Sequence, residues 1–217
     1  MRKIAAIVTG VLVLTACVVS AQDSMKMTQE SPKAKSGHAA MAQGGGKADA
    51  ATIAKAVSAG PPEIRKDATV MGLGADGQMK QLRAGTNGWM CMLDPVGNAM
   101  CLDKEWQAWG DAWMHKQDPP QPKAVGVAYM LRGDNGASNT DPFATKPTPD
   151  NQWVVSGPHI MLLPTDRSQL DAFPTDPHTG GPWVMWKGTK YAHIMVPTAA
   201  MPKAAATAQS APKATTK

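Results

Sequence analysis

A short repeat contains the residues best suited to chemistry. Its two copies are His159-Ile160-Met161 and His193-Ile194-Met195, each following a Trp-Val pair and soon followed by Pro-Thr. Side chains two residues apart in a strand share a face, so each His is expected to project together with its Met. Imidazole and thioether form a soft donor set that suits Cu(I). The predicted copper ligands are therefore His159, Met161, His193 and Met195, with further sulfur available from Met90, Met92, Met100 and Met130.

A structural interpretation of the same repeat is also open. In that interpretation Ile194 and Val196 form the core face of the last strand, while His193 and Met195 lie on the other face beneath a helix or a loop. Methionine commonly fills gaps in protein cores, and a buried His is often only hydrogen bonded. The two interpretations differ in whether the four side chains converge on one ion.

A second group of candidate ligands lies between residues 132 and 152. This stretch is longer than irregular loops usually are in compact domains, so we expect a loop able to cover a small polar pocket. Its oxygen donors would suit Ca²⁺, but the residue order of an EF-hand is absent, and the same residue types form turns. Turn formation is the favoured interpretation for Asp134, Asn135, Ser138, Asn139 and Asp141.

The sequence lacks the motifs of common hydrolases. There is no Gly-x-Ser-x-Gly, no His-Glu-x-x-His and no Gly-rich phosphate loop. A base, an orienting carboxylate and a hydroxyl nucleophile can be chosen from the chain, but any sequence of this length offers such a set. These residues are His159, His193, Asp141, Asp176, Ser138 and Ser156. An enzyme is therefore not favoured, and a hydrolase of unknown substrate is the last of the functions considered.

The cysteines predict one disulfide. Cys91 and Cys101 flank a Pro- and Gly-containing turn between two apolar arms, which brings the sulfurs together. Closing so short a loop stabilises the fold by about 3 kcal/mol through chain entropy. A redox-active or metal-binding pair usually has Cys-x-x-Cys spacing, so we predict a structural disulfide.

The N-terminus, residues 1–21, is typical of a secretory signal peptide. Two basic residues precede an apolar run that is too short to span a membrane. Leu14-Thr15-Ala16-Cys17 fits a lipobox and predicts acylation of Cys17, whereas Val19-Ser20-Ala21 fits ordinary cleavage before Gln22. We favour the lipobox. Both alternatives predict an exported protein, which is periplasmic or is tethered to the outer membrane through an N-terminal lipid.

Composition divides the rest of the chain. Residues 22–59 and 199–217 contain no aromatic residue and predict a disordered linker and a disordered Ala/Pro/Lys tail. Residues 60–198 contain all seven Trp and predict a single globular domain. This part has 12 Lys and Arg against 14 Asp and Glu, although the whole chain carries +5, so nucleic acid is not an expected partner. The basic tails suit an envelope polymer, a protein partner or a membrane surface, and simple solubility explains them as well.

The domain predicts an α+β fold, with a mainly antiparallel sheet and one Trp-rich helix packed on one face. The helix is expected from Asp103, as its cap, to about Lys116, with Trp106, Trp109 and Trp113 on one side. Strand patterns occur at 69–71, 79–83, 89–93, 125–131, 153–163 with a bend at 157–158, 183–186 and 191–196.

Several blocks resemble a family of uncharacterised exported bacterial proteins. They are 82–89 (LRAGTNGW), 138–143 (SNTDPF), 157–161 (GPHIM) and 191–197 (YAHIMVP). The resemblance covers most of residues 64–198 and implies no activity, substrate or catalytic residue. The sequence therefore predicts a ligand-binding or structural module of the cell envelope. The alternatives are a periplasmic copper-binding protein that uses His and Met ligands and, last, a hydrolase.

Overall fold

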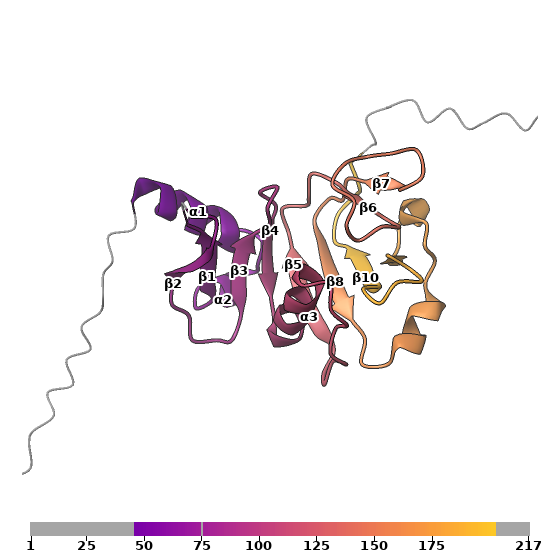
Figure 1. Ribbon diagram of the computed structural model, residues 1–217, viewed down its shortest axis with the longest axis horizontal. Helices are drawn as coiled ribbons and strands as arrows, with labels where there is room; N and C mark the ends of the chain where they lie inside the picture. Colours follow the sequence, from indigo (N-terminus) through magenta and orange to yellow (C-terminus); the bar gives the residue numbers. More distant parts are fainter. Residues whose placement is uncertain (1–45, 75, 203–217) are drawn as a thin grey trace, which may run out of the picture. The chain divides into compact units, whose positions relative to one another are not determined.

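An eight-stranded sheet organises the part of the chain that the computed structural model describes, residues 46–74 and 76–202. The strand order is β2-β1-β3-β4-β5-β8-β10-β9, and every neighbouring pair is antiparallel except β1 with β3 (Figure 1). This agrees with the predicted α+β class. The strands are β1 (Thr69–Leu73), β2 (Met79–Arg83), β3 (Met90–Leu93), β4 (Ala99–Leu102), β5 (Gly126–Met130), β8 (His159–Leu163), β9 (Trp183–Met185) and β10 (His193–Pro197).

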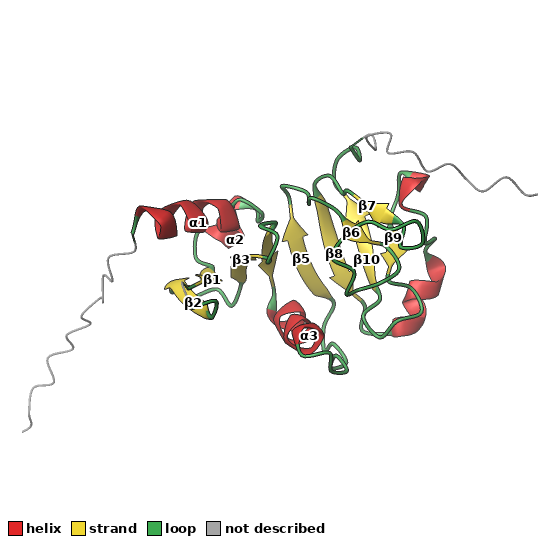
Figure 2. Ribbon diagram, turned by 45° about the horizontal axis from the view of Figure 1, so that its top comes forward, coloured by secondary structure: helices red, strands yellow, loops and turns green. Residues whose placement is uncertain are grey.

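Helix α3 (Lys104–Met114) packs on one face of the sheet (Figure 2). It begins where the sequence predicts, because the Asp103 side chain accepts a hydrogen bond from the backbone N–H of Trp106 at 2.9 Å. Helical spacing turns Trp106 and Trp109 toward the sheet, where both are buried. They join a methionine- and tryptophan-rich core formed with β4, β5, β8, β9 and β10.

Helix α1 (Lys47–Val57) corrects the predicted start of the domain. The composition predicts a disordered linker over 22–59, but 47–57 is helical, and Ala56 and Ala59 are fully buried. They pack with Val70 and the two cysteines on the sheet face opposite α3. The prediction was wrong over this part because it relied on the lack of aromatic residues. Alanine has a small side chain, so it lets a helix lie close against a sheet.

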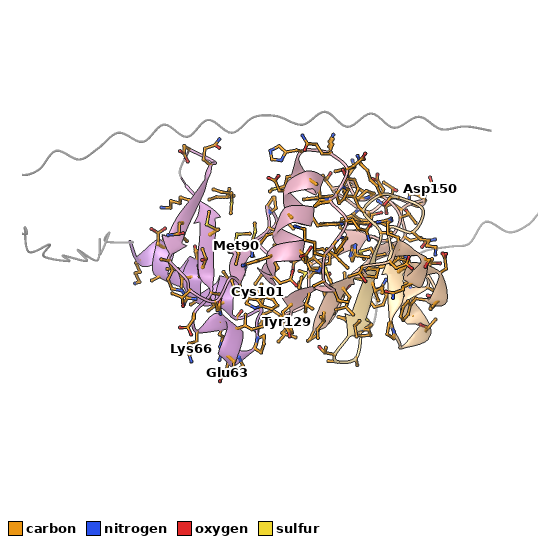
Figure 3. All side chains as sticks on the ribbon, turned by 90° about the horizontal axis from the view of Figure 1, so that it is seen from below. Glu63, Lys66, Met90, Cys101, Tyr129 and Asp150 are labelled. Atoms are coloured by element: carbon orange, nitrogen blue, oxygen red, sulfur yellow. A yellow bond between two sulfur atoms is a disulfide. The ribbon has the colours of Figure 1, made fainter. Side chains whose placement is uncertain are left out.

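The predicted disulfide between Cys91 and Cys101 is present and lies beside α1. The two residues are opposite each other in β3 and β4, with their Cα atoms 4.0 Å apart, and neither is exposed. A Cβ on Gly60, just after α1, would lie 3.0 Å from the Sγ of Cys101, so the chain passes directly over the sulfur. Helix α2 (Pro62–Arg65) follows, and Figure 3 shows its Glu63 on the side of the sheet away from α3.

The predicted loop from 132 to 152 is held by its own hydrogen bonds. The short strands β6 (Ala137–Ser138) and β7 (Trp153–Val154) pair across it. The Ser138 hydroxyl donates to the carbonyl oxygen of Asn151 at 2.9 Å and accepts from the backbone N–H of Asp141 at 2.8 Å. These polar side chains therefore form turns, as favoured from the sequence.

The segment between β8 and β9 covers part of the sheet face opposite α3. It contains two 3₁₀ helices, η1 (Arg167–Ala172) and η2 (Pro177–Thr179). Leu170 of η1 packs with Val184, Ala192 and Ile194 in a third core. The two faces of β10 therefore lie in different environments, with Ile194 in this third core and Met195 in the core beneath α3.

The predicted tail also begins later than expected. Met201 packs against the core beneath α3, so the chain stays with the domain beyond residue 199. The predictions of a signal peptide over 1–21, of a lipid at Cys17 and of disorder beyond residue 202 lie outside the described residues. No helix within the described ranges is both long enough and apolar enough to cross a membrane.

Candidate metal centre

The four predicted copper ligands lie on one face of two neighbouring strands. Strands β8 and β10 are antiparallel, with Met161 opposite Met195 and His159 opposite Pro197. Because side chains alternate along a strand, His159, Met161, His193 and Met195 all face α3. All four are buried, which agrees with the structural interpretation of the repeat as well as with a site.

The register separates the two histidines. His193 lies four residues before Pro197, the partner of His159, so the two Cα atoms are offset by about 13 Å along the strands. Two ligand atoms on one ion are at most about 4 to 5 Å apart, because bonds to nitrogen and sulfur are about 2.0 to 2.3 Å. The structure therefore brings Met161 and Met195 together and keeps the two imidazoles apart. The prediction that these four residues converge on one copper ion is therefore wrong, because the register separates them into two His–Met pairs.

Each histidine has a second methionine directly opposite it. Met130 of β5 pairs with His159, and Met185 of β9 pairs with His193. The β-carbons of such cross-strand pairs are about 4.5 to 5.5 Å apart. The arrangement has a local two-fold axis between Met161 and Met195. The axis relates His159 to His193 and Met130 to Met185. We call the halves the His159 triad (His159, Met130 and Met161) and the His193 triad (His193, Met185 and Met195).

The hydrogen bonds of the histidines fix which ring nitrogen carries the proton. His159 Nδ1 lies 2.7 Å from the carbonyl oxygen of Gly157, and His193 Nδ1 lies 3.0 Å from that of Tyr191. A carbonyl oxygen only accepts, so we assign the proton to Nδ1 in both rings. The Nε2 atoms then carry bare lone pairs, and neither has a hydrogen-bond partner among the described residues. This arrangement, with Nδ1–H bonded to a carbonyl, is typical of metal-ligating histidines.

Burial keeps both imidazoles neutral. It lowers the pKa of His193 to about 4, against the opposing effect of the hydrogen bond to Tyr191. Burial also lowers the pKa of His159, and here the Gly157 carbonyl and the Asp134 carboxylate oppose it. Neutral imidazole is the form that binds metal ions, so both lone pairs are available at neutral pH.

Tryptophan rings enclose the His193 triad. The ring planes of Trp106, Trp109 and Trp186 are near-perpendicular to the imidazole plane, with centroids 5.3, 5.7 and 4.9 Å away. The Trp186 indole N–H donates to the carbonyl oxygen of Ser138 at 2.7 Å, which fixes this ring against the loop. The indole N–H groups of Trp106 and Trp109 have no partner among the described residues.

A carboxylate accompanies the His159 triad. The Oδ1 atom of Asp134 accepts from the backbone N–H groups of Gly136 and Ser156, each at 2.9 Å. Ser156 directly precedes Gly157, whose carbonyl holds the His159 ring. Burial raises the pKa of Asp134, and the two backbone hydrogen bonds and His159 oppose the rise. From the sequence, the loop that contains Asp134 was expected to cover a small polar pocket with His159 or His193 nearby, but Asp134 itself was not singled out as the group beside His159.

Of the serine and aspartate residues considered for a hydrolase, Ser138, Asp141 and Asp176 have other contacts, whereas the buried Ser156 hydroxyl has no hydrogen-bond partner among the described residues. The Ser138 hydroxyl is held by Asn151 and Asp141. Asp141 accepts from the backbone N–H of Phe143, and Asp176 caps η2. Both buried histidines bond carbonyl oxygens through Nδ1, so the described residues do not form a Ser-His-Asp relay.

Comparison of the chain with protein-family models, with curated proteins and with solved structures finds no match. The described ranges contain no group of three or more His, Cys, Asp and Glu side chains placed to hold a metal ion. The fold and the site define an α+β domain that has two buried His–Met–Met triads on the sheet face against which the Trp-rich helix packs.

Proposed function

We propose that this protein is an exported binding module of the cell envelope and that its ligand is Cu(I). One observation carries the proposal: two fully buried imidazoles with bare Nε2 atoms, each beside two thioethers. A buried polar atom without a partner costs about 1 to 3 kcal/mol. A metal ion bound to Nε2 would recover that energy. Export rests on the signal-like N-terminus, with a location in the periplasm or, through Cys17, on the outer membrane.

The donor chemistry favours Cu(I) over other ions. Thioethers are soft, uncharged ligands that select Cu(I), whereas Ca²⁺ and Mg²⁺ need several oxygen ligands and Zn²⁺ prefers thiolate, imidazole or carboxylate. The charge of the ion also favours Cu(I) over divalent ions. Transfer of an ion into a low-dielectric interior costs energy that rises with the square of its charge, so a divalent ion is about four times as expensive as a monovalent one.

A second candidate function, the binding of an envelope polymer, is favoured by a different observation. The rings of Phe143 and Trp113 are near-parallel at 6.0 Å, as are those of Trp113 and Trp186 at 6.4 Å. Phe143 is 40% exposed. Aromatic faces of this kind can contact the apolar face of a sugar. Co-sedimentation with insoluble peptidoglycan tests this candidate, and W113A together with F143A should abolish it.

Cu(I) binding is tested by anaerobic titration of the mature chain against a chromophoric Cu(I) chelator. We expect the wild type to remove Cu(I) from the chelator and the double variant H159Q/H193Q to fail. The matched control H178Q/M114L replaces an exposed histidine and an exposed methionine. It should bind as the wild type does.

The tails need their own control, because they also contain His and Met. A variant with replacements at Met25, Met27, His38 and Met41 should keep the binding measured for the wild type. Tryptophan fluorescence and circular dichroism establish that each variant is folded. Equal Cu(I) removal by the wild type and by a folded H159Q/H193Q variant would refute the proposal.

A further inference from the structure

Both triads are buried, but a row of methionines leads from half-buried positions on β3 and β4 to the His159 triad. Continuing the register of β3, β4, β5 and β8 gives a row of side chains across one sheet face: Met92, Met100, Met130 and His159. Burial increases along this row. Met92 and Met100 are half-buried, Met130 is buried, and His159 is 0% exposed. Each strand from β3 to β5 therefore contributes one thioether sulfur to the row that ends at the His159 ring.

The spacing of this row suits the transfer of a soft ion. Neighbouring strands lie about 4.8 Å apart, so an ion bound to one methionine is within reach of the next. The transfer is a ligand exchange: a bond to one sulfur breaks as a bond to the next forms, and the ion stays Cu(I). No oxidant, reductant or proton is needed. The ion exchanges one neutral ligand for another along the whole row.

The two triads also differ in charge. Asp134 lies on the His159 side, held by Ser156 and Gly136, and its carboxylate acts on His159. A buried monovalent cation in this triad therefore has a nearby counter-charge. The described contacts of His193 are different: a carbonyl oxygen and three indole rings that lie near-perpendicular to the imidazole plane. A cation there would have its charge balanced only by dipoles and aromatic rings.

We infer that the two triads fill in order: Cu(I) enters along Met92 and Met100 and occupies the His159 triad first, and the enclosed His193 triad fills second. This inference rests on the proposed function. Met161 and Met195, opposite each other on β8 and β10, connect the two triads. The second ion reaches His193 through them.

The order of filling can be measured with Ag(I), a redox-stable substitute for Cu(I), and the mature protein labelled with ¹³C in its methionine methyl groups. Single Met→Leu variants assign the methyl signals with little change in core volume. We expect the first equivalent of Ag(I) to shift the Met130 and Met161 signals, and the second to shift those of Met185 and Met195. Shifts of Met185 first, or of both sets in parallel, would overturn the inference.

Variants separate this inference from the proposed function. H193Q should keep the first equivalent and lose the second, whereas H159Q should lose the first. M92L/M100L should slow Cu(I) uptake from the chelator several-fold and leave the final affinity almost unchanged. The matched control M79L/M114L replaces two exposed methionines and should not slow uptake. D134N should weaken the first equivalent by about tenfold, the lower end of the range for groups that support a metal ligand.

The outcomes are distinguishable. If folded wild-type protein binds neither Cu(I) nor Ag(I), the proposed function and the inference fail together. If Cu(I) binds but H193Q removes the first equivalent, or if M92L/M100L takes up the ion at the wild-type rate, only the inference fails.

Discussion

The His193 imidazole should make the copper-free protein sensitive to mild acid. Its pKa is about 4 in the fold because of burial, against about 6.5 for a histidine in an unfolded chain. Above pH 6.5 both states are neutral at this position, and the stability does not depend on it. Between pH 6.5 and pH 4, His193 binds a proton in the unfolded chain but stays neutral in the folded protein. The free energy of unfolding therefore falls as the pH falls.

The size of the effect follows from the two pKa values. They differ by about 2.5, and one pKa unit corresponds to about 1.4 kcal/mol. Acidification from pH 7 to pH 4 should therefore remove about 3 kcal/mol from the free energy of unfolding through His193 alone. Burial lowers the pKa of His159 as well, which adds to the loss. Burial raises the pKa of Asp134, which acts in the opposite direction as that carboxylate takes up its proton.

Urea unfolding followed by tryptophan fluorescence measures this loss at a series of pH values from 7 to 4. The wild type and H193Q are compared, because their difference cancels the contributions of the other titrating groups. H193Q should start less stable and lose less on acidification. H178Q, with an exposed histidine replaced, should follow the wild type. Parallel curves for wild type and H193Q would refute the reasoning that a buried neutral imidazole occupies this position.

Three further predictions concern the fold. D103A removes the cap of α3 and a hydrogen bond from the backbone N–H of Val127, and it should cost at least about 1 kcal/mol in urea unfolding, with D118A as the exposed control. C91S/C101S should lower stability by about 3 kcal/mol and abolish the effect of a reductant on the unfolding midpoint. A chain that starts at residue 60 should lose stability relative to one that starts at residue 46, because Ala56 and Ala59 are buried; equal midpoints would show that α1 is dispensable.

Local patterns in the sequence predicted the elements well. The Asp103 cap and the tryptophan spacing define α3, and the two cysteines around a Pro-Gly turn define the β3–β4 hairpin. The turn chemistry of the 132–152 loop was also visible. Each of these features depends on residues close together in the chain, for which propensity and periodicity are strong guides.

The start of the domain and the true partners of the histidines were harder to predict. Helix α1 contains alanine and lysine but no aromatic residue, so its composition resembles that of a linker, and only contact with the sheet reveals its role. Met185 was not among the predicted sulfur donors, because its pairing with His193 depends on strand register. The repeat of His-Ile-Met did predict the shared face. It could not predict that antiparallel pairing would place the two histidines at opposite ends of a methionine pair.

The position of Gly60 over the disulfide has a consequence for the order of assembly. Thiol–disulfide exchange requires an attacking thiolate to approach a sulfur directly. In the folded protein Cys91 and Cys101 are fully buried, and the chain around Gly60 covers the Cys101 sulfur. Oxidation must therefore be complete before α1 and the residues that follow it dock, or this segment must move away from the sheet for oxidation to occur. The rate at which a small thiol reduces the disulfide of the folded protein therefore measures how often α1 opens. This local opening is distinct from the unfolding of the whole domain.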